Sequence, residues 1–360
     1  MTETAFQTDA ERQADSWTVA PPDAVGLDGA VLDTLEGWLA SFPEANVHGV
    51  LVVRHRTLVY ERYFAGEDQI WAQPIGIVSF QRDTKHDLRS VTKSVTSLLV
   101  GIAIDRKLIR SIEEPIFDFF SEYADLRTPE KDRILLRHLL TMSAGFEWDE
   151  YRPYTDTMNS EIRMIWSPDR YRFALEQPVV ASPGMRWDYN TGSSELLGAI
   201  VSKTAGRPLE DFAQEFLFDP LGITDVAWSK YPNSDIISSG SGLRLRPRDM
   251  ARLGQLVLDQ GQWEGQQIVS AEWIKDSIVP QIGPADRTLF YGYQWWLGRS
   301  LVKQQEVLWI AGMGLGGQRI FIVPAFDLVV VVTAGDYSGP TQAWVSSVVL
   351  NRYVFPAITA

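Results

Sequence analysis

A predicted helix with two reactive groups in its first turn constrains this chain more than any other stretch. The helix begins at Ser90 and ends near Asp105-Arg106-Lys107, and the apolar residues that follow Lys93 at helical spacing predict that most of its length is buried. Ser90 and Lys93 are three residues apart, so their side chains share one face. The helix N-terminus and burial both favour a neutral Lys93, which can take a proton from the Ser90 hydroxyl. The pattern fits an activated serine nucleophile, and equally a serine that only begins a helix.

The same spacing occurs a second time, at Ser300 and Lys303. This copy lies in a polar segment between two apolar, aromatic-rich runs, where a hairpin turn is the expected structure. We therefore interpret Ser300 and Lys303 as part of a solvated loop and keep Ser90 as the candidate nucleophile.

Composition limits the other kinds of chemistry. The chain has 360 residues and no cysteine, which excludes disulfides, thiolate catalysis and cysteine-based zinc sites. Its histidines have neither the spacing of a helical metal-binding pair nor an obvious acidic cluster around them, so structural or surface roles are expected. No metal and no cofactor is predicted. The histidines are His48, His55, His86 and His138.

The charge balance bears on partners and location. The net charge of −13 comes from 33 basic and 46 acidic residues, and no block rich in lysine and arginine stands out. Nucleic-acid binding is not expected, because phosphate contacts need concentrated positive charge. No segment is apolar enough to span a membrane, and residues 1–15 do not have the pattern of a signal peptide. The expected location is cytoplasmic, with a trimmed periplasmic form as the alternative, and nothing in the sequence indicates the oligomeric state.

Strand patterns at both ends of the chain and helical patterns between them predict the fold class, α/β (α+β). The strands can pair into one antiparallel sheet covered by the first and last helices. Residues 1–87 and 286–360 then form a sheet domain, residues 88–285 form a large, mostly helical inserted domain, and the active site lies at their junction. The expected strands are 47–54, 58–64, 291–297, 307–311, 318–323 and 328–333, and the expected helices are 28–42, 90–105, 134–141, 193–204, 208–218, 248–260, 270–279 and 341–353.

Three segments have no regular pattern. Residues 1–18 are expected to be a flexible or surface-wrapped lead-in, and residues 64–88 are irregular. Residues 151–169 form a long connection rich in aromatic residues and arginine. Because long loops are often functional, this connection is a candidate lid or pocket wall, with an ordered surface loop as the alternative.

Three motifs in order resemble the serine β-lactamase/penicillin-binding superfamily, in its class C-like branch of esterases and 6-aminohexanoate-oligomer hydrolases. The first is Ser90-Val91-Thr92-Lys93 at a helix start. The second is Pro183 to Gly192, in which Tyr189 follows a Pro-Gly turn and precedes an apolar helix. The third is the glycine-rich run from Ala311 to Gln318. Supporting stretches lie at 136–145 and 241–252, so the resemblance covers nearly the whole chain.

The resemblance implies a β-lactamase/transpeptidase-like fold and a catalytic set of Ser90, Lys93 and Tyr189. Ser90 would form an acyl-enzyme, and either neutral Lys93 or an ionised Tyr189 would be the base. The oxyanion hole would consist of the amides of Ser90 and Leu315. Further candidates for substrate binding are Asn190, Gly314, Gly316, Trp148, Tyr154 and Trp166.

Two departures from the family pattern matter. Tyr231-Pro232-Asn233 matches the literal Tyr-x-Asn spacing better than the Tyr189 motif, but its polar surroundings predict a surface tyrosine. In the third motif, Gly312 stands where penicillin-recognising members carry a lysine or histidine. The absence of that cation favours uncharged small-molecule esters or amides as substrates. A β-lactamase or D-amino-acid peptidase, and a non-catalytic binding protein on the same fold, remain the alternatives.

Overall fold

An eight-stranded sheet lies at the centre of the fold. The computed structural model describes residues 17–232, 234–285 and 288–359. The strand order is β1-β3-β2-β15-β14-β13-β12-β11, and every neighbouring pair is antiparallel except β1 with β3. The strands are β1 (Thr18–Val19), β2 (Val47–Arg54), β3 (Thr57–Tyr63), β11 (Phe290–Tyr291), β12 (Trp296–Val302), β13 (Gln305–Gly314), β14 (Gln318–Val323) and β15 (Leu328–Ala334).

The central strands are buried on both faces, which explains their nearly continuous apolar sequences. Val50 and Val52 of β2 face one hydrophobic core, whereas Leu51 and Val53 face the other. Side chains alternate between the two faces of a strand, so each central strand supplies both cores.

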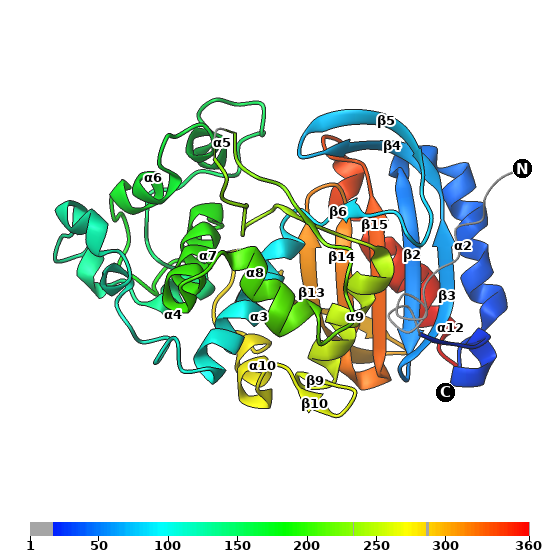
Figure 1. The fold of residues 1–360 in the computed structure, drawn as a ribbon. Helices are drawn as coiled ribbons and strands as arrows, with labels where there is room; N and C mark the ends of the chain where they lie inside the picture. The colour runs from blue at the N-terminus through cyan, green and yellow to red at the C-terminus, as the bar shows by residue number, and fades with distance from the viewer. Residues whose placement is uncertain (1–16, 233, 286–287, 360) are drawn as a thin grey trace, which may run out of the picture.

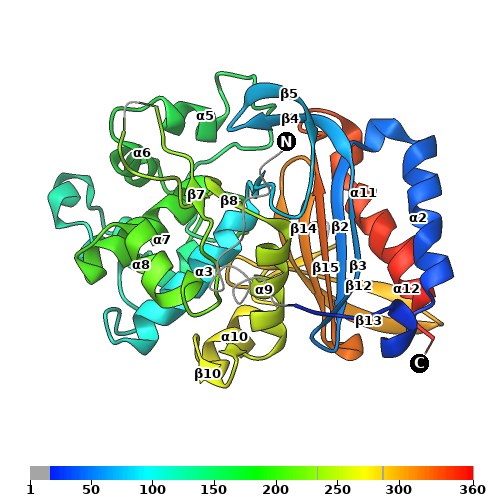
Figure 2. The same cartoon turned by 45° about the vertical axis from the view of Figure 1, so that its right-hand side comes forward.

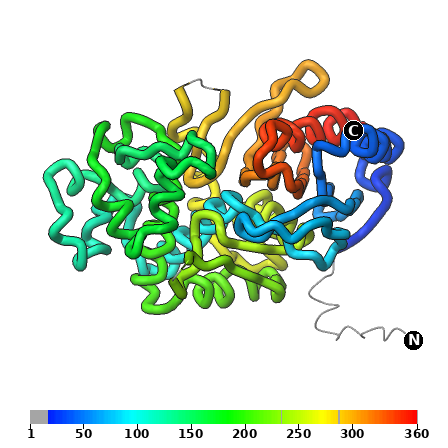
Figure 3. Tube along the Cα trace, turned by 90° about the horizontal axis from the view of Figure 1, so that it is seen from above, coloured from blue at the N-terminus to red at the C-terminus, as the bar shows by residue number. Residues whose placement is uncertain are grey.

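Helices cover the two faces in different ways. Helix α2 (Gly29–Ser41) and the C-terminal helical segment, which includes α11 (Val345–Val348) and α12 (Phe355–Ala357), lie together on the outer face (Figures 1 and 3). Helix α9 (Pro247–Leu258) packs on β2, β14 and β15 from the opposite face, and the helical region extends away from it (Figure 2). The sheet is therefore the middle layer of three.

The helical region is built around two long buried helices. Helix α3 (Val91–Asp105) packs against α7 (Thr191–Ala205) and against strand β13. This contact brings the start of α3 to the edge of the sheet. Within the described residues, no helix is long and apolar enough to cross a membrane. The remaining helices of this region are α4 (Leu136–Leu140), α5 (Ser160–Ile165), α6 (Arg170–Glu176), α8 (Leu209–Ala213) and α10 (Ala271–Ser277).

The predicted fold class is confirmed, with local corrections. Residues 64–88 are not irregular throughout, because β4 (Ala65–Ile70) and β5 (Gln73–Ser79) form a hairpin that arches over the sheet (Figure 1), and β6 (His86–Asp87) follows. Most side chains of the hairpin are at least partly exposed, so it has no apolar alternation to detect.

Two further segments differ from expectation. The connection 151–169 is interrupted by helix α5, whose N-terminus is capped by the side chain of Asn159. The predicted strand 291–297 is divided between β11 and β12, because the chain turns at residues 292–295. The division into two domains stays a prediction, and most of the lead-in at 1–18 lies outside the described residues.

Replacement of two helix glycines by alanine is expected to change stability in opposite directions. Gly37 is exposed in the middle of α2 with nothing within 4 Å of where a Cβ would lie, whereas a Cβ on Gly101 in α3 would lie 2.3 Å from Cδ1 of Trp273. Gly37→Ala is expected to raise the free energy of unfolding by about 0.5–1 kcal/mol through lost chain entropy. Gly101→Ala is expected to lower it by about 1–3 kcal/mol through overpacking. Denaturant titration of both variants measures this, and an unchanged Gly101→Ala would contradict the packing described.

Candidate active site

The start of helix α3 brings the first predicted pair together. Ser90 is the residue before the first turn of α3, and Lys93 lies in that turn with 1% of its surface exposed. The Lys93 Nζ is 3.1 Å from Ser90 Oγ. This distance allows direct proton transfer between hydroxyl and amine.

A buried glutamate fixes the other contact of Lys93. The Lys93 Nζ also donates a hydrogen bond to the carbonyl oxygen of Gly240, at 2.9 Å. The Gly240 amide in turn donates to Glu195 Oε1 on α7, at 2.8 Å, and the hydroxyl of Ser238 donates to the same oxygen. Glu195 therefore holds the loop whose carbonyl orients Lys93. The sequence analysis did not identify Glu195, because a single glutamate in a helix has no distinguishing pattern.

Tyr189 completes the cluster from the turn before α7. Its ring stacks on Trp296 with 6.0 Å between ring centroids, and Lys93 Nζ lies 5.1 Å from the Tyr189 centroid. Burial raises the pKa of Tyr189 well above its usual value, and the charge of Glu150 acts in the same direction, although a hydrogen bond with Ser90 opposes them. The phenol therefore keeps its proton at neutral pH.

A pocket of about 410 Å³ opens over this cluster. Ser90 and Tyr189 line one side, and Gly314 and Leu315 at the end of β13 line another. Within the described chain, neither the Ser90 amide nor the Leu315 amide donates a hydrogen bond to another backbone group. A Cβ on Gly314 would lie 2.3 Å from the carbonyl oxygen of Leu88, so glycine is needed for this close approach.

The other predicted substrate-binding residues have different positions. Tyr154 lines the pocket, but Trp148 is buried and donates from its indole to Glu150. Asn190 is the N-cap of α7 and accepts a hydrogen bond from the Ser193 amide, which is a structural role. The Gly316 amide donates to the Gln342 side chain, and Gly316 does not line the pocket.

Trp166 is not part of this pocket. Its side chain is 69% exposed and lines a separate depression with Pro168 and Tyr231. The prediction that Trp166 contacts substrate is therefore not supported by its position. Its position in the aromatic-rich connection 151–169 did not indicate a place in the pocket, because Trp166 follows helix α5 and lies outside the pocket that Ser90 lines.

Several pocket residues were missed. Met313, Trp296 and Arg319 line it from the sheet, and Gly339, Pro340, Gln342 and Ala343 line it from the segment before the last helices. Arg319 is a buried cation: its guanidinium donates to the carbonyl oxygens of Gly314 and Gln318, and burial lowers its pKa to about 10. Of these residues only Met313 lies in a motif. Arg319 reaches the pocket because the pairing of β13 with β14 places it opposite Met313.

Two buried carboxyl groups lie behind the pocket. Glu150 Oε1 accepts from the Thr191 hydroxyl at 2.6 Å, and its Oε2 accepts from the Thr191 amide at 2.8 Å. Burial raises the pKa of the neighbouring Glu161 to about 8, and the negative charge of Glu150 adds to this effect. Glu161 is therefore protonated at neutral pH and shares a hydrogen bond with Glu150.

The two rival motifs have clear outcomes. Lys303 lies in the β12–β13 turn, as expected. Ser300 instead belongs to strand β12, where it pairs with Val307, and its Oγ accepts from the Trp309 indole. The prediction that Tyr231 lies at the surface is wrong, since its side chain is 4% exposed. Its ring lies 4.2 Å from the guanidinium carbon of Arg170. The polar sequence around Tyr231 does not indicate this contact, because Arg170 lies on helix α6, which was not predicted.

The histidines also need a correction. His55 is exposed and pairs with Asp327, whereas His48 and His86 are buried side by side with the carboxylate of Asp68. An acidic neighbour is therefore present, although residues 48, 68 and 86 are too far apart in sequence to indicate it. Burial lowers the pKa of His48 to about 2 and also lowers that of His86. His138 is buried too, and its pKa is lowered to about 4 by burial.

Comparison with known proteins shows the family and the fold. The model of the Beta-lactamase family matches residues 35–343. The 6-aminohexanoate-dimer hydrolase of Paenarthrobacter ureafaciens is 23% identical over 355 residues, which cover 94% of this chain and 84% of that protein. A candidate 6-aminohexanoate-dimer hydrolase from Bacillus anthracis superposes with a TM-score of 0.74 at 21% identity, over 94% of this chain and 86% of that one. EstCE1, a hydrolase with promiscuous acyltransferase activity, superposes with a TM-score of 0.67 at 18% identity, over 89% of this chain and 97% of that one. The superfamily inferred from the motifs and the predicted fold are both confirmed.

The raised pKa of Glu161 predicts how stability depends on pH. Folded Glu161 keeps a proton up to about pH 8, whereas the unfolded chain releases it near the usual value of 4.5, so the free energy of unfolding falls as pH rises through this window. Glu161→Gln is expected to remove most of that fall, which amounts to at most about 1.4 kcal/mol per pH unit. Urea unfolding at several pH values measures it. The exposed Glu147→Gln is the control, and equal slopes in the Glu161 variant and the wild type would contradict the assignment.

Proposed function

Because this chain belongs to the Beta-lactamase family, a family of hydrolases, we propose that it hydrolyses small esters or linear amides through an acyl-enzyme on Ser90. The observation that carries the proposal is the 3.1 Å contact between Lys93 Nζ and Ser90 Oγ at the floor of a pocket. A hydroxyl and a buried amine at this distance form a nucleophile and its base.

Lys93 is the base in this scheme. The raised pKa of Tyr189 argues against an ionised phenol in the free enzyme, which was the other assignment open to the sequence. Lys93 takes the Ser90 proton as Ser90 Oγ forms a bond to the substrate carbonyl carbon. The Gly240 carbonyl keeps the amine aligned with Ser90 during this transfer.

The amides of Ser90 and Leu315 stabilise the oxyanion that forms on the carbonyl oxygen. Both residues line the pocket, and the Ser90 amide is unused because it precedes the first turn of α3. Fixed donors of this kind contribute about 3–4 kcal/mol each to the lowering of an acyl-transfer barrier.

Tyr189 delivers the proton to the leaving group. Its phenol stays protonated and is in hydrogen-bond contact with Ser90, so it can pass a proton to the alcohol or amine as the substrate bond breaks. Lys93, protonated in the first step, returns its proton to Tyr189. Water then attacks the acyl carbon, gives a proton to the same relay and releases the acid with Ser90 restored.

The pocket favours uncharged acyl groups. Gly312 leaves the strand without a cation, and the Nη atoms of the nearby Arg319 already donate to backbone carbonyl oxygens. These contacts of the Nη atoms support the pocket wall. Met313 and Trp296 add apolar surface. The proposed substrates are short-chain esters and uncharged linear amides, with β-lactams turned over poorly.

Replacement of the nucleophile tests the proposal. Ser90→Ala is expected to lower kcat/KM for p-nitrophenyl butyrate by about 10³-fold or more, because no acyl-enzyme can form. Ser300→Ala is the matched control, since it has the same Ser-x-x-Lys spacing without the pocket. A fluorophosphonate probe should label Ser90 in the wild type and should not label the Ser90→Ala variant. Wild-type turnover by Ser90→Ala, an adduct on another residue, or nitrocefin hydrolysis faster than ester hydrolysis would each contradict the proposal.

The two tyrosine motifs make a second test. Tyr189→Phe is expected to lower kcat/KM for the same ester by about 10²–10⁴-fold, the usual contribution of a proton-transferring group. Tyr231→Phe keeps the contact with Arg170 and should change turnover less than about 3-fold by comparison. Steady-state kinetics with circular dichroism as a folding check measures both. A larger loss of kcat/KM in the Tyr231 variant than in the Tyr189 variant would contradict the assignment of Tyr189 as the proton donor.

A further inference from the structure

Three side chains from separate segments meet in a buried cluster away from Ser90. His48 lies on β2, Asp68 on β4 and His86 on β6. One ligand atom from each lies within 4.8 Å of the other two, and all three residues are buried. The cluster plays no part in the mechanism proposed above.

The outer nitrogens of both imidazole rings face oxygen atoms that can only accept a hydrogen bond. His48 Nε2 is 3.1 Å from Asn46 Oδ1, and the orientation of this amide is fixed because Asn46 Nδ2 donates to the Glu67 carbonyl oxygen. His86 Nδ1 is 3.0 Å from the carbonyl oxygen of Asp87. Each neutral ring therefore carries its hydrogen on the outer nitrogen.

The inner nitrogens are then two lone pairs that face each other. His48 Nδ1 and His86 Nε2 are 2.8 Å apart. If either ring turned its hydrogen inward, it would leave an outer lone pair against the oxygen of Asn46 or Asp87. A cation between the inner nitrogens removes this conflict.

Asp68 supplies the negative charge. Its side chain is 1% exposed, Oδ1 lies 3.8 Å from His86 Nε2, and Oδ1 accepts from the Tyr337 hydroxyl at 2.7 Å. Its Oδ2 is buried and has no hydrogen-bond partner among the described residues. A buried carboxylate oxygen without a partner is costly, and a bound cation would compensate it.

The surroundings hold the two rings in place. The Phe80 ring stacks on His48 with 4.1 Å between centroids. A Cβ on Gly66 would lie 2.6 Å from His48 Nε2, and one on Gly335 would lie 2.5 Å from His48 Cε1. Glycine at both positions lets two backbone segments close around His48.

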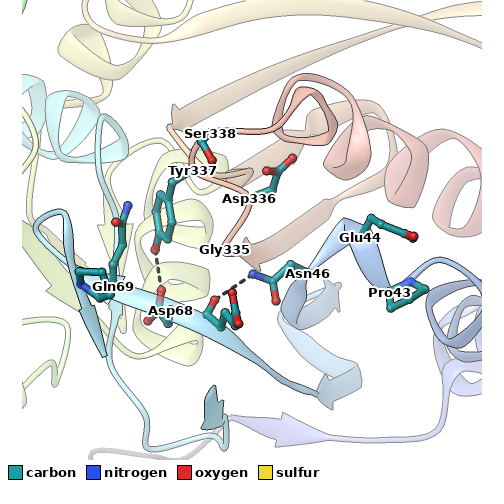
Figure 4. A pocket seen from close by; sticks show the side chains of 11 residues that line it. Pro43, Glu44, Asn46, Asp68, Gln69, Gly335, Asp336, Tyr337 and Ser338 are labelled. Atoms are coloured by element: carbon teal, nitrogen blue, oxygen red, sulfur yellow. Dashed lines mark hydrogen bonds between the residues drawn. The ribbon is translucent and has the colours of Figure 1, made fainter. Parts of the chain in front are cut away.

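A pocket adjoins the cluster at Asp68. A pocket of about 480 Å³ is lined by Asn46, Asp68 and Tyr337, among others. Figure 4 shows Asp68 and Tyr337 joined by their hydrogen bond at this pocket, with Asn46 beside them. Asp68 is thus both a wall of the pocket and a member of the cluster.

We propose that His48 Nδ1, His86 Nε2 and the Asp68 carboxylate bind a divalent transition-metal ion of the zinc class. Two imidazoles and one carboxylate are a common ligand set for such ions. The hydrogen bonds from the outer ring nitrogens to Asn46 and Asp87 would orient the two histidines toward the metal ion. Ligand bonds of about 2.0–2.1 Å require the inner nitrogens to lie about 3.3 Å apart, so the rings would separate by about half an ångström. A small ligand from the adjacent pocket would complete the coordination.

The site would brace the segment that carries the nucleophile. His86 lies four residues before Ser90, and between them Asp87 is paired with Arg244 while the Arg89 guanidinium lies over the Tyr337 ring at 4.9 Å. Tyr337 in turn contacts Asp68. A metal ion here would stabilise the fold around residues 86–89 without contacting substrate.

Metal binding by the full chain tests the proposal. Protein produced with zinc in the medium and purified without chelator is expected to carry about one Zn²⁺ per chain by elemental mass spectrometry. After chelator treatment, added Zn²⁺ should raise Tm, and added Co²⁺ should produce visible d–d absorption. Asp68→Asn, nearly identical in shape, is expected to weaken Zn²⁺ binding by about 100-fold or more, and Asn46→Ala by about 10-fold. Both affinities can be measured by competition with a chromophoric chelator.

His55→Gln is the matched control, because His55 is an exposed histidine paired with Asp327 and should bind Zn²⁺ like the wild type. His86→Gln should lose binding, and Asp68→Asn decides the matter if the His86 variant does not fold. The proposal is overturned if wild-type protein binds no Zn²⁺ or Co²⁺, which would leave a shared proton between the rings, or if Asp68→Asn binds as tightly as the wild type. Labelling of Ser90 by a fluorophosphonate is measured on the same samples, so failure of this site is distinguishable from failure of the proposed hydrolase.

Discussion

The contact of one buried lysine with Ser90 and Gly240 is the interaction on which the site depends. Lys93 has no exposed route to water, so its Nζ must find partners inside the protein. Those partners come from two places: the residue that begins α3 and a loop held by α7. The position of Ser90 relative to Lys93 therefore depends on the packing of α3 against α7 and β13.

Buried carboxyl groups set the electrostatics around that contact. Glu195 holds the Gly240 loop, and the pair of Glu150 and Glu161 lies behind Tyr189. Burial, together with the charge of Glu150, keeps the Tyr189 phenol protonated, which favours the proposed role of proton donor over that of base. In the proposed mechanism, Lys93 rather than Tyr189 therefore begins the reaction.

Much of the fold was readable because its patterns are strong. The central strands and helices α2, α3, α7 and α9 carry long apolar runs or clear end signals such as Asp28, which caps α2 as expected. The β4–β5 hairpin and α5 were missed because their burial patterns are irregular and their sequences polar. Helix α6 was also not predicted, and Arg170 on that helix covers Tyr231, which was expected at the surface.

The sequence by itself determined the candidate pair of Ser90 and Lys93, the helix that carries it and the tyrosine after the Pro-Gly turn, because these depend on local spacing and on motifs. Only the tertiary structure decided the rest of the site. Arg319 reaches the pocket through strand register, and Trp166 is turned away by α5. His48, Asp68 and His86 meet only because the β4–β5 hairpin and β6 close over β2. Contacts between distant segments depend on packing, and no local pattern records them.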